Sequence, residues 1–115
     1  MIRIESSEKL LEVLCRVAEV GAYGSGEVTI LPKGSGGFMK LYDGGIVKVK
    51  AVISASGFGG RRALLRMADL ASERLAGFSG EGIIKISSPF PAVIAKAEES
   101  GFIRIEKDIE VIYRG

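Results

Sequence analysis

The segment between residues 46 and 66 limits the fold more than any other part of this sequence. It reads IVKVKAVISASGFGGRRALLR, so an apolar run ends in a loop of small residues and an apolar repeat of helical period follows. This pattern predicts a strand, a glycine-rich turn and a helix in direct succession. At such a junction, unpaired backbone N–H groups and the positive end of the helix dipole face the loop. The segment therefore predicts a phosphate-binding loop, with a plain tight turn as the alternative.

The candidate binding residues lie in this loop and directly after it. They are Ser54, Ser56, Gly57, Phe58, Gly59, Gly60, Arg61 and Arg62. Glycine lets a ligand come close to the backbone, and the two arginines add positive charge at the rim. Phe58 is predicted either to cover a bound ligand or to pack back into the core.

The composition predicts one domain, residues 1–115, and excludes several kinds of chemistry. The chain has no histidine, so Ser-His-Asp triads, Cys-His pairs and His-ligated zinc sites are excluded. No catalytic residue can be assigned from the sequence. The net charge of +2 is too small to indicate nucleic acid unless the charges cluster. The absence of Asn and Gln is typical of proteins from hot environments.

The single cysteine and the first residues of the chain predict the cellular location of the protein. Cys15 lies within an expected apolar helix, so it is predicted to be a core residue, with a reactive thiol as the alternative. No stretch resembles a membrane span or a signal peptide. We therefore expect a cytoplasmic protein without membrane contact.

The predicted elements follow the order β-α-β-β-β-α-β-α-β. Strands are expected at 1–4, 27–31, 38–42, 46–54, 80–87 and 102–113, the last either as one extended segment or as a hairpin around Lys107. Helices are expected after Ser6, after Gly60 and from Pro91 to about residue 100. The strand at 80–87 has the continuous apolar character of a buried parallel strand. The order predicts an α/β domain with a mixed sheet flanked by helices.

The helix after the glycine loop is predicted to be amphipathic. Leu64, Ala68, Ala71 and Leu75 recur at helical spacing and form one apolar stripe, which Leu65 and Met67 are expected to widen.

Two short sequence motifs predict local structure elsewhere in the chain. Asp43-Gly44-Gly45 is typical of a hairpin turn, and Ser6 is typical of a helix N-cap.

The element order and the loop resemble the GNAT superfamily of acyl-CoA N-acyltransferases. Two stretches carry the resemblance: VKAVISASGFGGRRALLRMADLASERL and PAVIAKAEESGFIRIEKDIEVIY. The resemblance implies that the loop N–H groups hold the pyrophosphate of coenzyme A or acyl-CoA. It also implies a splayed gap between central strands for the pantetheine arm, and direct attack of an amine on the thioester.

The chain departs from the family's pattern at four positions. Ser56 replaces the leading Arg or Gln of the loop, and Arg61 stands where Gly or Ala belongs. Ala97 replaces the tyrosine that often protonates the thiolate, and Phe90 lies near the place of the late asparagine. The departures leave open both an active acyltransferase and a degenerate, binding-only member.

A small nucleic-acid-binding domain is the alternative function. The basic residues that such a domain would use are Arg61, Arg62, Arg66 and Arg74 with Lys48 and Lys50, and its stacking aromatics are Phe38, Tyr42 and Phe58. Small archaeal chromatin and RNA-binding domains also place a Gly/Arg loop between strand and helix, which is an analogy only. A partner-binding module is a third reading, and a homodimer remains open.

Overall fold

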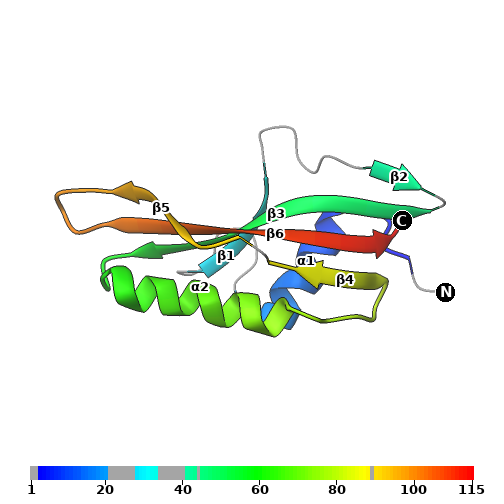
Figure 1. The fold of residues 1–115 in the computed structure, drawn as a ribbon, viewed down its shortest axis with the longest axis horizontal. Helices are drawn as coiled ribbons and strands as arrows, with labels where there is room; N and C mark the ends of the chain where they lie inside the picture. Colours follow the sequence, from blue (N-terminus) through cyan, green and yellow to red (C-terminus); the bar gives the residue numbers. More distant parts are fainter. Residues whose placement is uncertain (1–2, 21–27, 34–40, 44, 89) are drawn as a thin grey trace.

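The computed structural model describes residues 3–20, 28–33, 41–43, 45–88 and 90–115 (Figure 1). Its elements are α1 Ser7–Ala18, β1 Val28–Pro32, β2 Leu41–Asp43, β3 Ile46–Gly57, α2 Arg61–Leu75, β4 Ile83–Ser87, β5 Val93–Ala97 and β6 Ile103–Arg114. The molecule is elongated, measuring 48 × 25 × 24 Å. Its length follows from two strands, β3 and β6, of 12 residues each.

The six strands form one sheet around the pair of long strands. β3 and β6 pair antiparallel along their whole length, from Ile46 opposite Arg114 to Gly57 opposite Ile103. β1 and β2 pair with β3, while β4 and β5 pair with β6. Every one of these pairings is antiparallel, so each long strand is flanked by two short strands.

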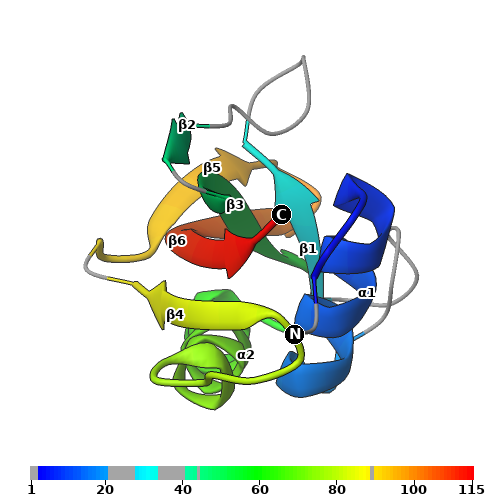
Figure 2. The same ribbon diagram turned by 90° about the vertical axis from the view of Figure 1, so that its right-hand side faces the viewer.

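Both helices contribute to the core from one side of this sheet (Figures 1 and 2). α2 contacts β3 and β6, and α1 contacts β1 and α2. Alternate residues of β3 face the helices and are buried: Val47, Val49, Ala51, Ile53 and Ala55. The predicted stripe of Leu64, Ala68, Ala71 and Leu75 is confirmed, since each of these residues is buried on α2.

The GNAT-like fold predicted from the sequence is wrong. The described elements run α-β-β-β-α-β-β-β, with two helices and an antiparallel sheet, in place of a mixed sheet with a parallel centre. β4 lies at the predicted strand 80–87, yet it pairs antiparallel with β6. Of the predicted strand 1–4, residues 3 and 4 are not in a strand, and residues 1–2 lie outside the described part, as do 38–40 of the predicted strand 38–42.

The late helix predicted between Pro91 and residue 100 is a strand, β5. Val93 and Ile94 are β-branched residues that suit a strand, and β5 pairs with the first residues of β6. Gly101, expected to end the helix, has φ +95° and lies in the turn between the strands. There Gly101 N–H donates to the Glu98 carbonyl (3.0 Å), and Glu98 N–H donates to the Phe102 carbonyl (2.9 Å).

Of the two options for the last segment, one strand or a hairpin near Lys107, the structure has one strand, because β6 runs without a break through this position. Lys107 lies opposite Ile53, and Asp108 lies opposite Val52. Charged residues inside a strand suggested a turn, but both side chains have partners. Lys107 forms an ion pair with Asp69 of α2 (3.3 Å), and Lys33 forms one with Asp108.

Two short sequence motifs predicted the local structure correctly. Ser6 is the N-cap of α1, and its hydroxyl accepts a hydrogen bond from the Lys9 N–H (3.1 Å). β2 and β3 pair antiparallel with Asp43 opposite Ile46, as the predicted hairpin requires. Gly44, in the turn itself, lies outside the described residues.

Candidate functional site

The predicted binding loop is shorter in the structure than in the sequence analysis. Ser54 lies inside β3, is 6% exposed and sits opposite Thr29 on one side and Glu106 on the other. Ser56 and Gly57 are the last residues of β3. The connection to α2 therefore consists of Phe58, Gly59 and Gly60, and only these three residues and the helix start are placed to meet a ligand.

Gly60 determines the geometry at the start of α2. It is the N-cap residue with φ 93° and ψ 155°, a backbone conformation that L-amino acids avoid. No side chain in the described structure caps this end, and the first helical hydrogen bond runs from Leu64 N–H to the Gly60 carbonyl (3.1 Å). The N–H groups of residues 61–63 therefore point out of the helix toward the loop, where they favour an anion.

The charge at this helix end also favours an anion. The first turn of α2 contains no acidic residue, and Arg61 and Arg62 occupy its first two positions. Two positive side chains beside the positive end of the helix dipole repel it. A bound anion would offset this repulsion. In many other helices, an acidic side chain in the first turn has the corresponding role.

An exposed aromatic pair stands next to the loop. Phe58 is 70% exposed, so it does not pack back into the core. Its ring meets that of Phe102 edge to face, with centroids 5.6 Å apart and planes at 67°. Because Phe102 precedes β6, the contact joins the loop to the β5–β6 hairpin and holds Phe58 at the surface.

The basic residues differ in whether an acidic side chain neutralises them. Arg74 pairs with Glu19 (3.0 Å) and Lys48 pairs with Glu110 (3.5 Å), so a carboxylate partly neutralises each of these two cations. Arg61, Arg62 and Arg66 are exposed and form no ion pair with any described residue. The free positive charge of α2 is thus concentrated in its N-terminal half.

The β5–β6 hairpin adds one cation that the sequence analysis missed. Arg104 is exposed and lies opposite Ser56, two residues before the loop begins at Phe58. Lys96 lies opposite Arg104 but pairs with Glu98 (3.0 Å), and this hydrogen bond lowers the pKa of the Glu98 carboxyl. Arg104 was overlooked because only strand pairing brings it to the loop. We name Phe58, Arg61, Arg62, Arg66 and Arg104 the basic end.

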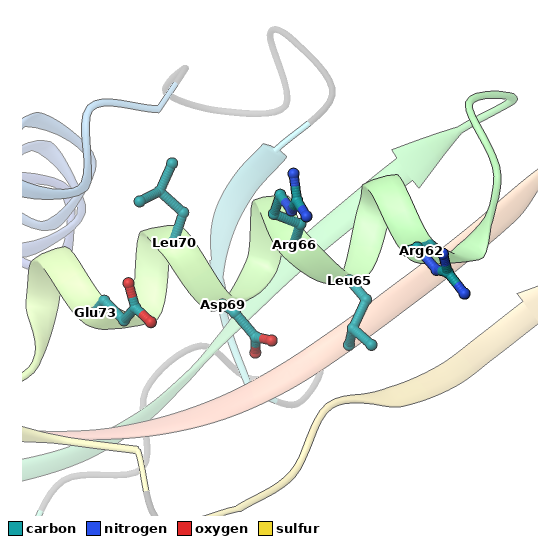
Figure 3. Close-up of a pocket in the computed structure, with 6 residues that line it drawn as sticks. All are labelled: Arg62, Leu65, Arg66, Asp69, Leu70 and Glu73. Atoms are coloured by element: carbon teal, nitrogen blue, oxygen red, sulfur yellow. The ribbon is translucent and has the colours of Figure 1, made fainter.

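Two shallow pockets lie along α2, and Arg62 and Arg66 of the basic end line both of them. One is lined by Gly59, Arg62, Ala63, Arg66, Met67 and Leu70. The other is lined by Arg62, Leu65, Arg66, Asp69, Leu70 and Glu73 (Figure 3). Both are formed by the loop and α2 alone, so they resemble a docking surface more than an enclosed small-molecule site.

The structure offers no slot where the GNAT resemblance placed the pantetheine arm. β3 and β4, the strands expected to splay apart, are not neighbours, because β6 lies between them. β3 and β6 pair continuously up to Gly57. Binding of coenzyme A stays a prediction that rests only on the loop and the start of α2.

Groups suited to catalysis are scarce near the loop. Tyr113 and Cys15 are buried, and Tyr23 and Tyr42 belong to segments whose side chains are not described. Among residues 3–20, 28–33, 41–43, 45–88 and 90–115, no group of acidic or cysteine side chains is arranged to hold a metal ion.

Cys15 is expected to be an unreactive core thiol. It is 3% exposed, and burial raises the pKa of its thiol, an effect that the backbone of Ile30 partly opposes. Because the thiolate is the reactive form, a thiol reagent should label folded protein roughly a hundredfold more slowly than unfolded protein. Absorbance after addition of Ellman's reagent, with and without denaturant, measures this ratio. Equal rates would restore the reactive-thiol reading.

No described helix has the length and apolar character needed to cross a membrane. No protein-family model and no curated protein matches this chain in sequence.

Proposed function

We propose that this protein binds nucleic acid through its basic end. The observation that carries the proposal is the uncapped start of α2, where free arginines follow a loop with an exposed phenylalanine. Nucleic acids present regularly spaced phosphates, and Lys or Arg side chains and helix N-termini are their usual partners. The overall charge is only +2, so the clustering of unpaired arginines is what supports binding.

Phe58 supports a preference for single-stranded segments. An exposed ring held by a second aromatic residue is a platform on which an unpaired base can stack. The bases of an intact duplex are already stacked on one another and cannot use such a platform. We therefore propose single-stranded nucleic acid as the favoured ligand and the cytoplasm as the place of binding.

Fluorescence anisotropy with a labelled single strand and the matching duplex tests this proposal. The variant Arg61→Ala/Arg104→Ala should lower the slope of log affinity against log salt by about 0.7 for each lost phosphate contact on a single strand. Arg61 and Arg104 are chosen because Arg62 and Arg66 also belong to the outer surface of α2. Phe58→Ala should weaken single-strand binding roughly tenfold and leave duplex binding nearly unchanged.

The control is Lys85→Ala/Arg114→Ala, which removes the same charge from exposed positions at the other end of β6 and on β4. It should bind like the unaltered protein. Equal losses of affinity in both double variants would mean that binding depends on the net charge of the protein and not on the basic end. No binding at about 50 mM salt with micromolar protein would reject the proposal. A thermal shift with coenzyme A but none with either strand would favour the cofactor prediction instead.

A further inference from the structure

The outer face of α2 carries six residues in a stripe, of which Asp69 at the edge pairs with Lys107 of β6. Figure 3 looks onto this stripe, which consists of Arg62, Leu65, Arg66, Asp69, Leu70 and Glu73. Their spacing of three and four residues places them on one side of a helix. The buried stripe of Leu64, Ala68, Ala71 and Leu75 faces the sheet.

Two leucines on this face are exposed to solvent. Leu65 is 38% exposed and Leu70 is 43% exposed. Leu65 was predicted to widen the buried stripe, and that prediction is wrong. Figure 3 shows Leu65 pointing to one side of the helix and Leu70 to the other, so charged side chains stand between them.

The order of charges along the stripe does not suit an isolated helix. Arg62 and Arg66 lie in its N-terminal half, while Asp69 and Glu73 lie in its C-terminal half. A helix favours the reverse order because of its dipole. Within the described structure, Arg62, Arg66 and Glu73 form no ion pairs, and Asp69 pairs with Lys107. The stripe thus presents separated, largely uncompensated charges of both signs.

The stripe is complementary to itself when two helices run in opposite directions. Arg62 and Glu73 are equally far from the midpoint between Met67 and Ala68, and the same holds for Arg66 and Asp69. A twofold axis at this midpoint would therefore bring opposite charges to the same level on two antiparallel helices. We propose that this face of α2 docks against α2 of a second copy of this chain.

In that arrangement each charged residue meets its opposite. Arg62 lies at the level of Glu73 of the partner subunit, and Arg66 lies at the level of Asp69 of the partner subunit. The twofold axis keeps like residues on the same side of the helix pair. The two copies of Leu65 therefore lie along one side and the two copies of Leu70 along the other, where they shield the ion pairs from water.

The interface is small, and it shares Arg62 and Arg66 with the basic end. One helix face of α2's length buries less than the surfaces of permanent dimers, so a dimer with a dissociation constant in the micromolar range is expected. The arrangement needs no ligand. It can therefore be tested without nucleic acid, and its failure would leave the proposed function standing.

Sedimentation equilibrium of the full chain from about 5 to 200 μM tests the proposal. The unaltered protein should dimerise. Arg62→Glu alone and Glu73→Arg alone should each weaken the dimer by about tenfold or more, since each places like charges opposite one another. The double variant Arg62→Glu/Glu73→Arg should restore dimerisation. These side chains are exposed, and circular dichroism checks that each variant is folded.

Lys85→Glu is the control, because it makes the same change of charge at an exposed position on β4. It should dimerise like the unaltered protein. A monomer throughout the concentration range would overturn the proposal. A dimer that both single variants leave intact would place the interface elsewhere. Failure of the double variant to recover, while the protein remains folded, would also contradict the antiparallel pairing.

Discussion

Replacing Ile53 with alanine is expected to lower the free energy of unfolding by about 2–5 kcal/mol. Ile53 is fully buried at the middle of β3, where the strand has β1 on one side and β6 on the other. The lost side-chain carbons leave a cavity that β1, β6 and the rest of the core cannot close without moving. Urea denaturation followed by circular dichroism measures the change, and the midpoint should fall while the slope stays constant.

Ile46→Ala provides the matched control. Ile46 is the first residue of the same strand and is 40% exposed. The identical substitution therefore removes fewer contacts, and it should cost about 1 kcal/mol or less. Similar losses at both positions would mean that the helix-facing side of β3 is not the core.

Replacing Gly60 with alanine is the second substitution with a large expected effect. The combination of φ 93° and ψ 155° at this position is open essentially to glycine alone. Space is not the obstacle, since a Cβ built here meets no atom within 4 Å. Backbone strain alone should therefore cost about 1–3 kcal/mol. It should also turn the first N–H groups of α2 and weaken single-strand binding.

Gly59→Ala separates strain from the mere presence of a methyl group in the loop. A Cβ at Gly59 would lie 4.0 Å from the Cβ of Ala63, which is ordinary contact, and φ is not positive there. Its effect on the urea midpoint should stay within about 0.5 kcal/mol. Should Gly59→Ala destabilise as much as Gly60→Ala, the described turn would be incorrect.

The two proposals share Arg62 and Arg66, and the variants are chosen to keep them apart. Arg61 and Arg104 carry the test of nucleic-acid binding, and neither lies in the stripe on the outer face of α2. The dimer is tested with substitutions at Arg62 and Glu73. A monomeric Glu73→Arg variant that still binds single strands would show that each copy of the chain has a complete binding site.

The sequence by itself determined the parts of the fold that depend on near neighbours. The period of apolar residues in α2, the Ser6 cap and the glycine turn before Arg61 were all predicted. These features reflect hydrogen bonds and contacts within one or two turns of the chain. A short window of residues holds the information for them.

The tertiary structure alone decided what depends on distant partners. The segment 91–100 is rich in alanine and charged residues, and only its hydrogen bonds to β6 make Val93–Ala97 a strand. The same pairing carries Arg104 to the loop. Which arginines remain free depends on where acidic residues of other elements lie, as Glu19 does for Arg74. Hydrophobic period and composition do not encode such contacts between separate elements. The basic end could therefore be identified only in the folded chain.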